Sequence, residues 1–267
     1  MTDTTTGHKE QVREYFDTDA QHYEDRRYTS EYRNCHQYSY LVRKMHVLNL
    51  LEKPAGSILD IGCGPGIYTK ELLERDFRVT GIDISPKMIE RARGKFSGEI
   101  ERGTVTFSAG EIYDLEGMEG VFDAALCIGV ISYIPLLGRF LDKLNSLLKP
   151  GGYAIIQISK KLSPKSLDEQ IVYPLLRSAK GLFRPGGNSG EWKFKLRRYR
   201  VRRFNDLCTN SGFELEEGIH FDYTLPLLNI LAQRLSLSLA RSLESKNSGI
   251  IQALLAGDYA ARYRKAL

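Results

Sequence analysis

The sequence has few cysteines and no arrangement that would join them. Its four cysteines, Cys35, Cys63, Cys127 and Cys208, are scattered over 267 residues and include no C-x-x-C pair. Zinc sites and disulfide frameworks need closely spaced thiols, so neither is predicted, and we expect no metal. Reduced thiols in a cytoplasmic protein are the expectation that follows.

Long apolar runs and a leader segment are lacking as well. The first ten residues are polar and rich in threonine, without the apolar core of a secretion signal. The most apolar later stretch, residues 225–243, is interrupted by Gln233, Arg234 and Arg241, which excludes a membrane-spanning helix there. The net charge of +5 is mildly basic and does not by itself indicate a nucleic-acid partner.

What the sequence does contain is a regular alternation of short apolar strands with helices. Strands are predicted at residues 57–61, 78–82, 105–109, 122–128, 153–158, 213–219 and 258–265. Helices are predicted at residues 68–75, 86–96, 138–148 and 201–210. This alternation predicts an α/β fold with a doubly wound, seven-stranded, mostly parallel sheet.

The pattern divides the chain into four predicted parts. Residues 1–54 form an N-terminal helical lid, helical from Gln11 to Leu51 and rich in tyrosine. Residues 55–159 form the Rossmann-like core. Residues 160–198, rich in Lys, Ser, Pro and Gly, form an inserted substrate arm. Residues 199–267 complete the sheet and carry a helical insertion at 225–255.

The most informative stretch is the glycine-rich loop after the first strand. Residues 58–66 read ILDIGCGPG, which places Gly62, Gly64 and Gly66 between a strand and a helix. Glycines there allow a tight turn and the close approach of a ligand. A dinucleotide fingerprint would need glycine at Ile67, and a phosphate loop would need a Gly-Lys-Ser/Thr sequence. The ligand is therefore not expected to be a pyrophosphate.

Two aspartates at strand ends indicate what the ligand carries instead. Asp60 precedes the first glycine, where a carboxylate repels phosphate and suits an ammonium group. Asp83 ends the second strand, where an acidic side chain can accept hydrogen bonds from ribose hydroxyls. The alternative for Asp83 is a cap on the helix that starts at Pro86. Together the two aspartates predict a nucleoside joined to an amino acid without phosphates.

Five motifs in this order resemble the class I methyltransferases that use S-adenosylmethionine (SAM), of the small-molecule type. Residues 58–66 are similar to the family's first motif and residues 79–85 to its ribose-binding motif. AGEI at 109–112 stands in the place of the adenine motif, with Glu111 where the family usually has Asp. FDAALCIGVISYI at 122–134 and KPGG at 149–152 complete the series.

The resemblance implies a cofactor role for each matching residue. Asp60 and Gly62 would hold the methionine end, Gly64 would pack beneath the cofactor, and Asp83 would take the ribose hydroxyls. The remaining implied contacts are Ile84, Glu111 and Ile112 around the adenine, Cys127 or Ile128 beside the methionine, and Tyr23. Tyr23 belongs to DAQHYE at 19–24, which resembles the family's Ala-x-x-Tyr-Asp lid. For Glu111 a solvated loop position, and for Cys127 simple packing, are the alternatives.

The catalytic residues are less clearly indicated. The methyl group of a sulfonium is already activated, so catalysis needs mainly in-line placement of a nucleophile, helped by a general base. Tyr133 lies where many family members carry His and can orient a substrate hydroxyl or be a packed aromatic. His22, His36 and His46 are possible bases, and His220 is a further candidate. The sequence does not decide among them.

The predicted function is methyl transfer from SAM to a small-molecule acceptor. The basic stretch at 193–203 and an apolar helical surface at 225–243 together resemble methyltransferases of lipid, glycan and natural-product pathways. This resemblance implies O-methylation of an apolar, lipid-linked or natural-product substrate. That surface can equally cover the core, a homodimer partner or a membrane to which the protein binds peripherally. N-methylation is an alternative, as is RNA or protein methylation by the basic stretch at 193–203. No RNA-binding module accompanies that stretch, so nucleic acid is not the favoured partner.

Overall fold

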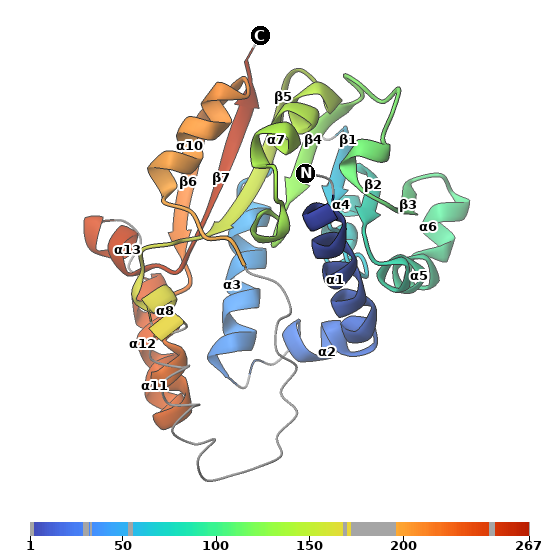
Figure 1. Ribbon diagram of the computed structural model, residues 1–267. Helices are drawn as coiled ribbons and strands as arrows, with labels where there is room; N and C mark the ends of the chain where they lie inside the picture. The colour runs from blue at the N-terminus through green and yellow to red at the C-terminus, as the bar shows by residue number, and fades with distance from the viewer. Residues whose placement is uncertain are drawn as a thin grey trace.

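The computed structural model describes residues 3–28, 32, 34–52, 56–167, 170–171, 196–245 and 249–266. Within these ranges a seven-stranded sheet has the order β3-β2-β1-β4-β5-β7-β6 (Figure 1). The strands are β1 (Ser57–Ile61), β2 (Arg78–Asp83), β3 (Val105–Ala109), β4 (Phe122–Cys127), β5 (Leu148–Ser159), β6 (Phe213–Phe221) and β7 (Asp258–Lys265). Strand β7 pairs antiparallel with β5 and β6, and the other pairs are parallel. The predicted seven-stranded, mostly parallel sheet is confirmed.

The strand order creates a switch point between β1 and β4. The chain winds from β1 outward through β2 to β3 and then returns to β4 on the other side of β1. At the carboxyl end of β1, Ile61 is in register with Ile82 of β2 and Cys127 of β4. In open α/β sheets, ligands bind in the crevice outside such a switch point. The fold therefore places the glycine-rich loop where a ligand is expected.

Alternating side chains direct the two faces of the sheet to different helices. Leu59 and Cys127 pack on the face covered by α7 (Leu137–Leu147) and α10 (Val201–Asn210). Ile58 and Leu126 pack on the opposite face. That face is covered by α3 (Cys35–Asn49), α4 (Thr69–Leu73) and α5 (Pro86–Lys95), with α6 (Ser97–Glu101) following α5. Strand β4 is largely buried, as its continuous apolar sequence predicted.

Strand β5 is longer than the sequence pattern indicated. Residues 149–152, which were expected to form a turn before a strand at 153, are part of β5, and Leu148 already pairs with Phe122. Lys149 Nζ binds Asp123 Oδ1 at 2.7 Å, and Gly151 supplies the positive φ of 72° that the irregular register needs. Pairing across the sheet therefore outweighs the local turn preference of Pro150.

The N-terminal segment folds as several helices that approach the switch point. They are α1 (Asp3–Asp19), the 3₁₀ turn η1 (Ala20–His22), α2 (Tyr23–Arg27) and α3. Helix α1 starts at Asp3, earlier than the predicted start at Gln11, and lies in front of the carboxyl ends of β1 and β2 (Figure 1). Asp17 Oδ1 accepts hydrogen bonds from Ser85 Oγ at 2.5 Å and Lys87 N at 3.3 Å, which fix α1 to α5.

The predicted helical insertion near the C-terminus consists of α11 (Pro226–Leu231), α12 (Gln233–Ser245) and α13 (Ile250–Leu255). Its exposed large apolar side chains are Leu231, Leu235, Leu239, Ile250, Ile251 and Leu254. Contact of this apolar surface with a partner copy or with a membrane stays a prediction. None of the helices in the described ranges combines the length and apolar character needed to cross a bilayer.

The predicted arm at 160–198 lies mostly outside the described residues. Residues 168–169 and 172–195 are not described, and neither is the beginning of the basic stretch at 193–203. The described parts are α8 (Pro164–Leu167), residues 170–171 and the returning segment 196–198. The returning segment runs beside the end of β5, where Tyr199 N donates to Ser159 O at 3.1 Å and Lys161 N donates to Tyr199 O at 2.8 Å.

Candidate active site

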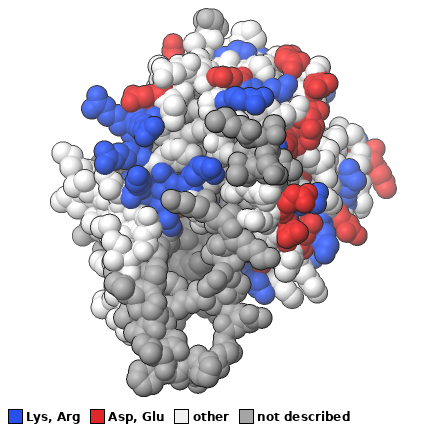
Figure 2. Space-filling model, in the orientation of Figure 1, with Lys and Arg blue, Asp and Glu red and all other residues white. Residues whose placement is uncertain are grey.

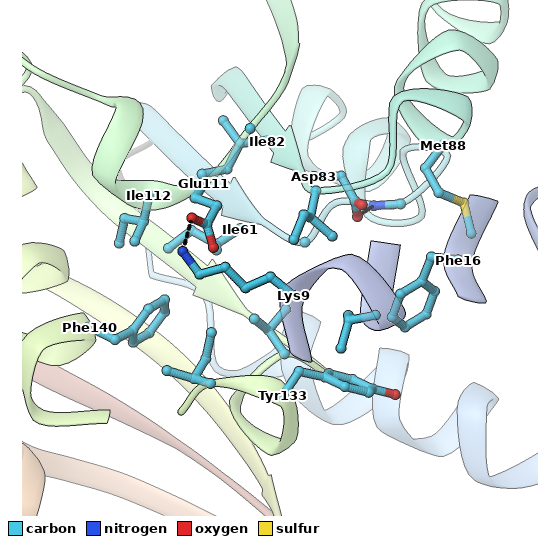
Figure 3. Close-up of a pocket in the computed structure, with 18 of the residues that line it drawn as sticks. Lys9, Phe16, Ile61, Ile82, Asp83, Met88, Glu111, Ile112, Tyr133 and Phe140 are labelled. Atoms are coloured by element: carbon cyan, nitrogen blue, oxygen red, sulfur yellow. Dashed lines mark hydrogen bonds and ion pairs between the residues drawn. The ribbon is translucent and has the colours of Figure 1, made fainter. Parts of the chain in front are cut away.

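A cavity opens at the switch point between the sheet and α1 (Figure 3). We call it the first cavity. Its walls come from the ends of β1 and β2, the loops after β3 and β4, and helix α1. The predicted residues that line it are Tyr23, Gly62, Gly64, Asp83, Ile84, Glu111, Ile112, Ile128 and Tyr133. The fold thus gathers most of the predicted cofactor residues into one place.

The glycine loop adopts a backbone that other residues would strain. Gly62, Gly64 and Gly66 have φ values of 68°, 55° and 80°. A Cβ at Gly62 would clash with Val130, and one at Gly66 would lie 2.6 Å from Phe96. Because the loop needs left-handed backbone and close packing at once, glycine is required there. Gly62 and Gly64 of this loop line the first cavity.

Asp83 connects the end of β2 to this loop. Its Oδ2 accepts from Gly64 N and its Oδ1 from Ser85 N, both at 2.9 Å. Burial raises the pKa of Asp83 to about 6, although both backbone donors act to lower it. The alternative role as a helix cap belongs to Ser85 instead, whose Oγ accepts from Met88 N at 3.1 Å. Asp83 therefore does not cap the helix, and it lines the first cavity.

Asp60 is a buried carboxylate with unused hydrogen-bonding capacity. The residue is 1 % exposed, and its Oδ2 has no partner among the described residues. Burial, followed by the charge of Asp83, raises the pKa of Asp60 to about 7. A buried polar atom without a partner is costly, so a ligand that donates to it is favoured. Asp60 does not itself line the first cavity, but its neighbours Ile61 and Gly62 do.

Helix α1 closes the opposite end of the cavity. Figure 3 shows the Lys9 side chain reaching across to Glu111, and their charged atoms lie 2.6 Å apart. His8, Val12 and Phe16 line the cavity from the same helix. His8 and Lys9 were missed in the sequence because the helix was expected to begin at Gln11. Val12 and Phe16 lie within the predicted helix but were given no role. The signal was nevertheless present, since His8, Val12 and Phe16 repeat with helical spacing.

Aromatic rings surround the end of the cavity near the glycine loop. The Phe16 ring centroid lies 5.4 Å from that of Tyr133 and 6.4 Å from that of Tyr23. Tyr23 also lies against Gly64, where an added Cβ would be 3.9 Å from the ring. Burial raises the pKa of Tyr133, so its phenol stays neutral and can orient a ligand but not act as a base. Aromatic rings of this kind attract cationic groups.

A second cavity, of about 500 Å³, adjoins the first. Gly129 and Tyr133 line both cavities, so the two meet at these residues. Where the first cavity is mainly apolar, the second is polar. The charged residues and the histidine in its wall are His36, Arg43, Lys160, Lys165, Arg198 and Asp258. A two-part site of this kind can hold two ligands next to each other.

Arg43 stands at the border between the cavities and was not predicted. Its Nη2 donates to Tyr28 Oη at 2.5 Å, whereas its Nε is buried without a hydrogen-bond partner in the described part of the chain. No ion pair to Arg43 occurs among the described residues. Its Nη1 lies 3.4 Å from where a Gly129 Cβ would be. No motif singles out this arginine, which lies within an ordinary helix.

Besides Asp60, four predicted residues do not line either cavity, namely His22, His46, Cys127 and His220. His22 is exposed on η1. His220 lies on the edge strand β6, packs 4.8 Å from the Tyr259 ring centroid, and has its pKa lowered to about 4 by burial. Cys127 is fully buried between the sheet and α7, and Ile128 lines the first cavity instead. Of the catalytic candidates, Tyr133 and His36 line a cavity. His46 instead pairs with Glu244, at 2.6 Å between Nε2 and Oε1.

No group of three or more His, Cys, Asp and Glu side chains in the described ranges is arranged to hold a metal ion.

Comparison with known proteins shows that residues 58–152 match a family described as "Methyltransferase domain". A ubiquinone biosynthesis O-methyltransferase from Xanthomonas axonopodis pv. citri is 32 % identical over 113 residues, which are 42 % of this chain and 46 % of that protein. A malonyl-[acyl-carrier protein] O-methyltransferase from Acetivibrio thermocellus is 35 % identical over 127 residues, 45 % of this chain and 43 % of that protein. The chain thus spans less than half the length of these relatives.

Among solved structures, magnesium protoporphyrin IX methyltransferase from Synechocystis PCC 6803, with bound SAH (S-adenosylhomocysteine), has a similar fold. The TM-score is 0.63 at 19 % identity, and the match covers 97 % of this chain and 100 % of that one. The likeness therefore extends beyond the matched domain to the whole fold.

Proposed function

We propose that this chain, a class I SAM-dependent methyltransferase by its matched domain and its fold, transfers the methyl group of SAM to a small-molecule acceptor held in the second cavity. The observation that carries the proposal is the meeting of two cavities at Gly129 and Tyr133. A cofactor in the first cavity and an acceptor in the second would face each other there. Catalysis by placement needs such an arrangement.

The residues of the first cavity fit SAM. Asp83 would accept hydrogen bonds from the ribose hydroxyls. The unpartnered Oδ2 of Asp60, just behind the wall of the cavity, would accept a hydrogen bond from the ammonium group. Glu111 and Ile112 would border the adenine, and the rings of Phe16 and Tyr23 would lie near the sulfonium. When bound, SAM supplies a methyl group that its sulfonium has already activated. The chain itself has to orient the acceptor and exclude water.

Tyr133 is the best-placed residue for orienting the acceptor. It lines both cavities, and its neutral phenol can donate a hydrogen bond to an acceptor oxygen. Phe16 packs edge-on against the Tyr133 ring, which limits how the ring can turn. We assign Tyr133 a positioning role. His22 and His220 reach neither cavity, whereas His36 lines the second cavity and is the remaining candidate base.

Oxygen is the acceptor atom that the comparisons favour. The two relatives described above are named as O-methyltransferases. N-methylation remains the alternative. The RNA or protein alternative depended on the basic stretch at 193–203, and its described residues add no observation in favour of it.

The test is transfer of labelled methyl from SAM to a lysate of the source organism, followed by separation of extractable small molecules from acid-precipitable polymer. We expect label in the extractable fraction with the wild-type chain and a large loss with Asp83→Asn. Asp76→Asn is the matched control, because Asp76 is exposed on the loop before β2 and has the positive φ of 63° that Asn tolerates. Label in the polymer would instead favour RNA or protein as the acceptor.

A further inference from the structure

The second cavity carries an excess of positive charge. Of its lining residues, Arg43, Lys160, Lys165 and Arg198 are basic, and Asp258 is the one carboxylate within the described part of the wall. A second carboxylate, that of Asp222, does not line the cavity but forms an ion pair with Lys165 at 2.5 Å. Figure 2 shows Lys and Arg side chains gathered on the same side of the molecule, around α10 and the segment before it. The cavity is therefore cationic even after its own ion pairs are counted.

Lys160 is the clearest sign of charge without compensation. The residue is 6 % exposed, and its Nζ donates to the carbonyl of Ala253, an uncharged acceptor. Burial lowers the pKa of Lys160 to about 8, although the charge of Asp258 partly opposes this effect. A buried ammonium is stabilised when an anion approaches it, since desolvation has already occurred in the folded chain.

Local backbone pairing brings Arg198 to the same wall. Lys160 and Tyr199 form an isolated parallel bridge, and Arg197 N donates to Ser132 O at 3.0 Å. The segment 197–199 is thus held between the end of β5 and the loop that carries Tyr133. Arg198 consequently lines the cavity together with Lys160, next to the point where the two cavities meet.

We infer, on the premise that the second cavity takes the methyl acceptor as proposed above, that this acceptor carries a carboxylate or phosphate group held by Lys160 and Arg198. Guanidinium and ammonium groups form short, strong hydrogen bonds to both kinds of anion. Arg43 adds positive charge at the border with the first cavity. A neutral apolar acceptor would offer the buried ammonium of Lys160 no anion.

Asp258 adds a second feature to the acceptor. Its side chain is 7 % exposed, accepts from the Ser159 hydroxyl, and leaves Oδ1 without a partner among the described residues. A hydroxyl or amine on the acceptor would satisfy this oxygen. The acceptor is accordingly a polar molecule with an anionic group and a separate hydrogen-bond donor.

Binding of simple anions to the chain saturated with SAH tests this inference directly. Malonate, inorganic phosphate and the neutral malonamide are titrated by calorimetry at constant ionic strength. We expect saturable binding of malonate or phosphate, and binding of malonamide weaker by about tenfold or more, the worth of a lost charge-assisted hydrogen bond. The preferred anion indicates whether the acceptor is a carboxylate or a phosphate.

Two variants and one control complete the test. Lys160→Met and Arg198→Gln should each weaken anion binding by about tenfold while SAH affinity changes by less than about twofold. Arg203→Gln, at an exposed position on α10, should leave both affinities unchanged. The inference is overturned if neither anion binds saturably, if malonamide binds as well as malonate, or if both variants behave as wild type. Failure of the wild-type chain to bind SAH would contradict the proposed function instead.

Discussion

The two cavities that meet at Gly129 and Tyr133 are built in different ways. The first is formed by the ends of neighbouring parallel strands and the loops that follow them, together with α1. The second is formed by α3, the end of β5, the returning segment 196–198 and the start of β7. The switch point of the sheet therefore provides one binding place, and elements added around the sheet provide the other.

Their charges are opposite in sign. The first cavity has Asp83 on its wall and Asp60 just behind it, whereas the second has Lys160 and Arg198. A ligand with an ammonium and a sulfonium suits the first, and an anion suits the second. Opposite charges in adjoining places would also draw the two ligands toward each other. The opposite charges of the two cavities therefore favour a different ligand in each.

Asp83→Ala is expected to have the largest effect on ligand binding in one cavity without affecting the other. SAH affinity should fall by about a hundredfold or more, because two hydrogen bonds to a carboxylate are lost at once. Malonate or phosphate binding in the second cavity should not change. Calorimetry on a variant with wild-type circular dichroism measures both. Near-normal SAH affinity would remove the ribose role of Asp83.

The pH dependence of cofactor binding comes next. The raised pKa values of Asp60, about 7, and Asp83, about 6, mean that both carboxylates hold protons in the ligand-free chain below those values. SAH needs the ionised forms, so its affinity should rise by about tenfold between pH 6 and pH 7.5. Asp60→Asn should remove most of the slope in a calorimetric pH series. A flat profile for the wild type would contradict the ammonium site.

Anion binding in the second cavity should change with pH in the opposite direction. The pKa of Lys160 is lowered to about 8, and an anion binds its protonated form. Malonate affinity should therefore fall by about tenfold between pH 7 and pH 9 as the ammonium loses its proton. Lys160→Arg, which keeps its charge, should remove this decrease. If affinity instead rose with pH, Lys160 would not be the anion-binding group.

A smaller effect is expected where the cavities meet. Tyr133→Phe should lower kcat/KM for methyl transfer by about fivefold, the worth of one hydrogen bond to the acceptor. SAH affinity should stay the same, because the ring is retained. Initial rates with the labelled extractable acceptor measure the change. Unchanged rates would make Tyr133 a packing residue, the alternative that the sequence left open.

The smallest effect concerns the contact that α1 makes across the first cavity. Lys9→Met should weaken SAH binding only about two- to fivefold, because the Lys9–Glu111 ion pair is partly exposed. Arg13→Gln removes an exposed ion pair with Glu10 on the same helix and serves as the matched control. Faster dissociation of SAH from Lys9→Met in stopped-flow measurements would be consistent with a lid. Equal dissociation rates in both variants would remove that role.

Much of the first cavity was predictable because its residues follow strands in short, continuous motifs. The glycine loop requires φ angles that only glycine adopts easily, so its conformation can be recognised from the glycines in the sequence. Asp60 and Asp83 stand at fixed positions relative to strand ends, and parallel pairing brings those ends together. The alternation of strands and helices likewise predicted the seven-stranded sheet.

The errors came from interactions that a local pattern does not contain. The start of α1 and the beginning of β5 depend on packing and pairing with distant segments. His22 and His220 were chosen for their chemistry, but the direction of a side chain depends on which face of an element meets the core. Arg43 was overlooked because nothing beside it in the sequence marks it.

The sequence by itself determined the fold class and the position of the glycine loop and its two aspartates at strand ends, because backbone geometry and strand ends leave local signatures. Only the tertiary structure decided that Arg43, Lys160, Arg198 and Asp258 share one wall. These residues are far apart in the chain, and no local rule relates them. Their common environment arises from strand pairing between β5, β7 and the segment before α10, which is a property of the folded chain alone.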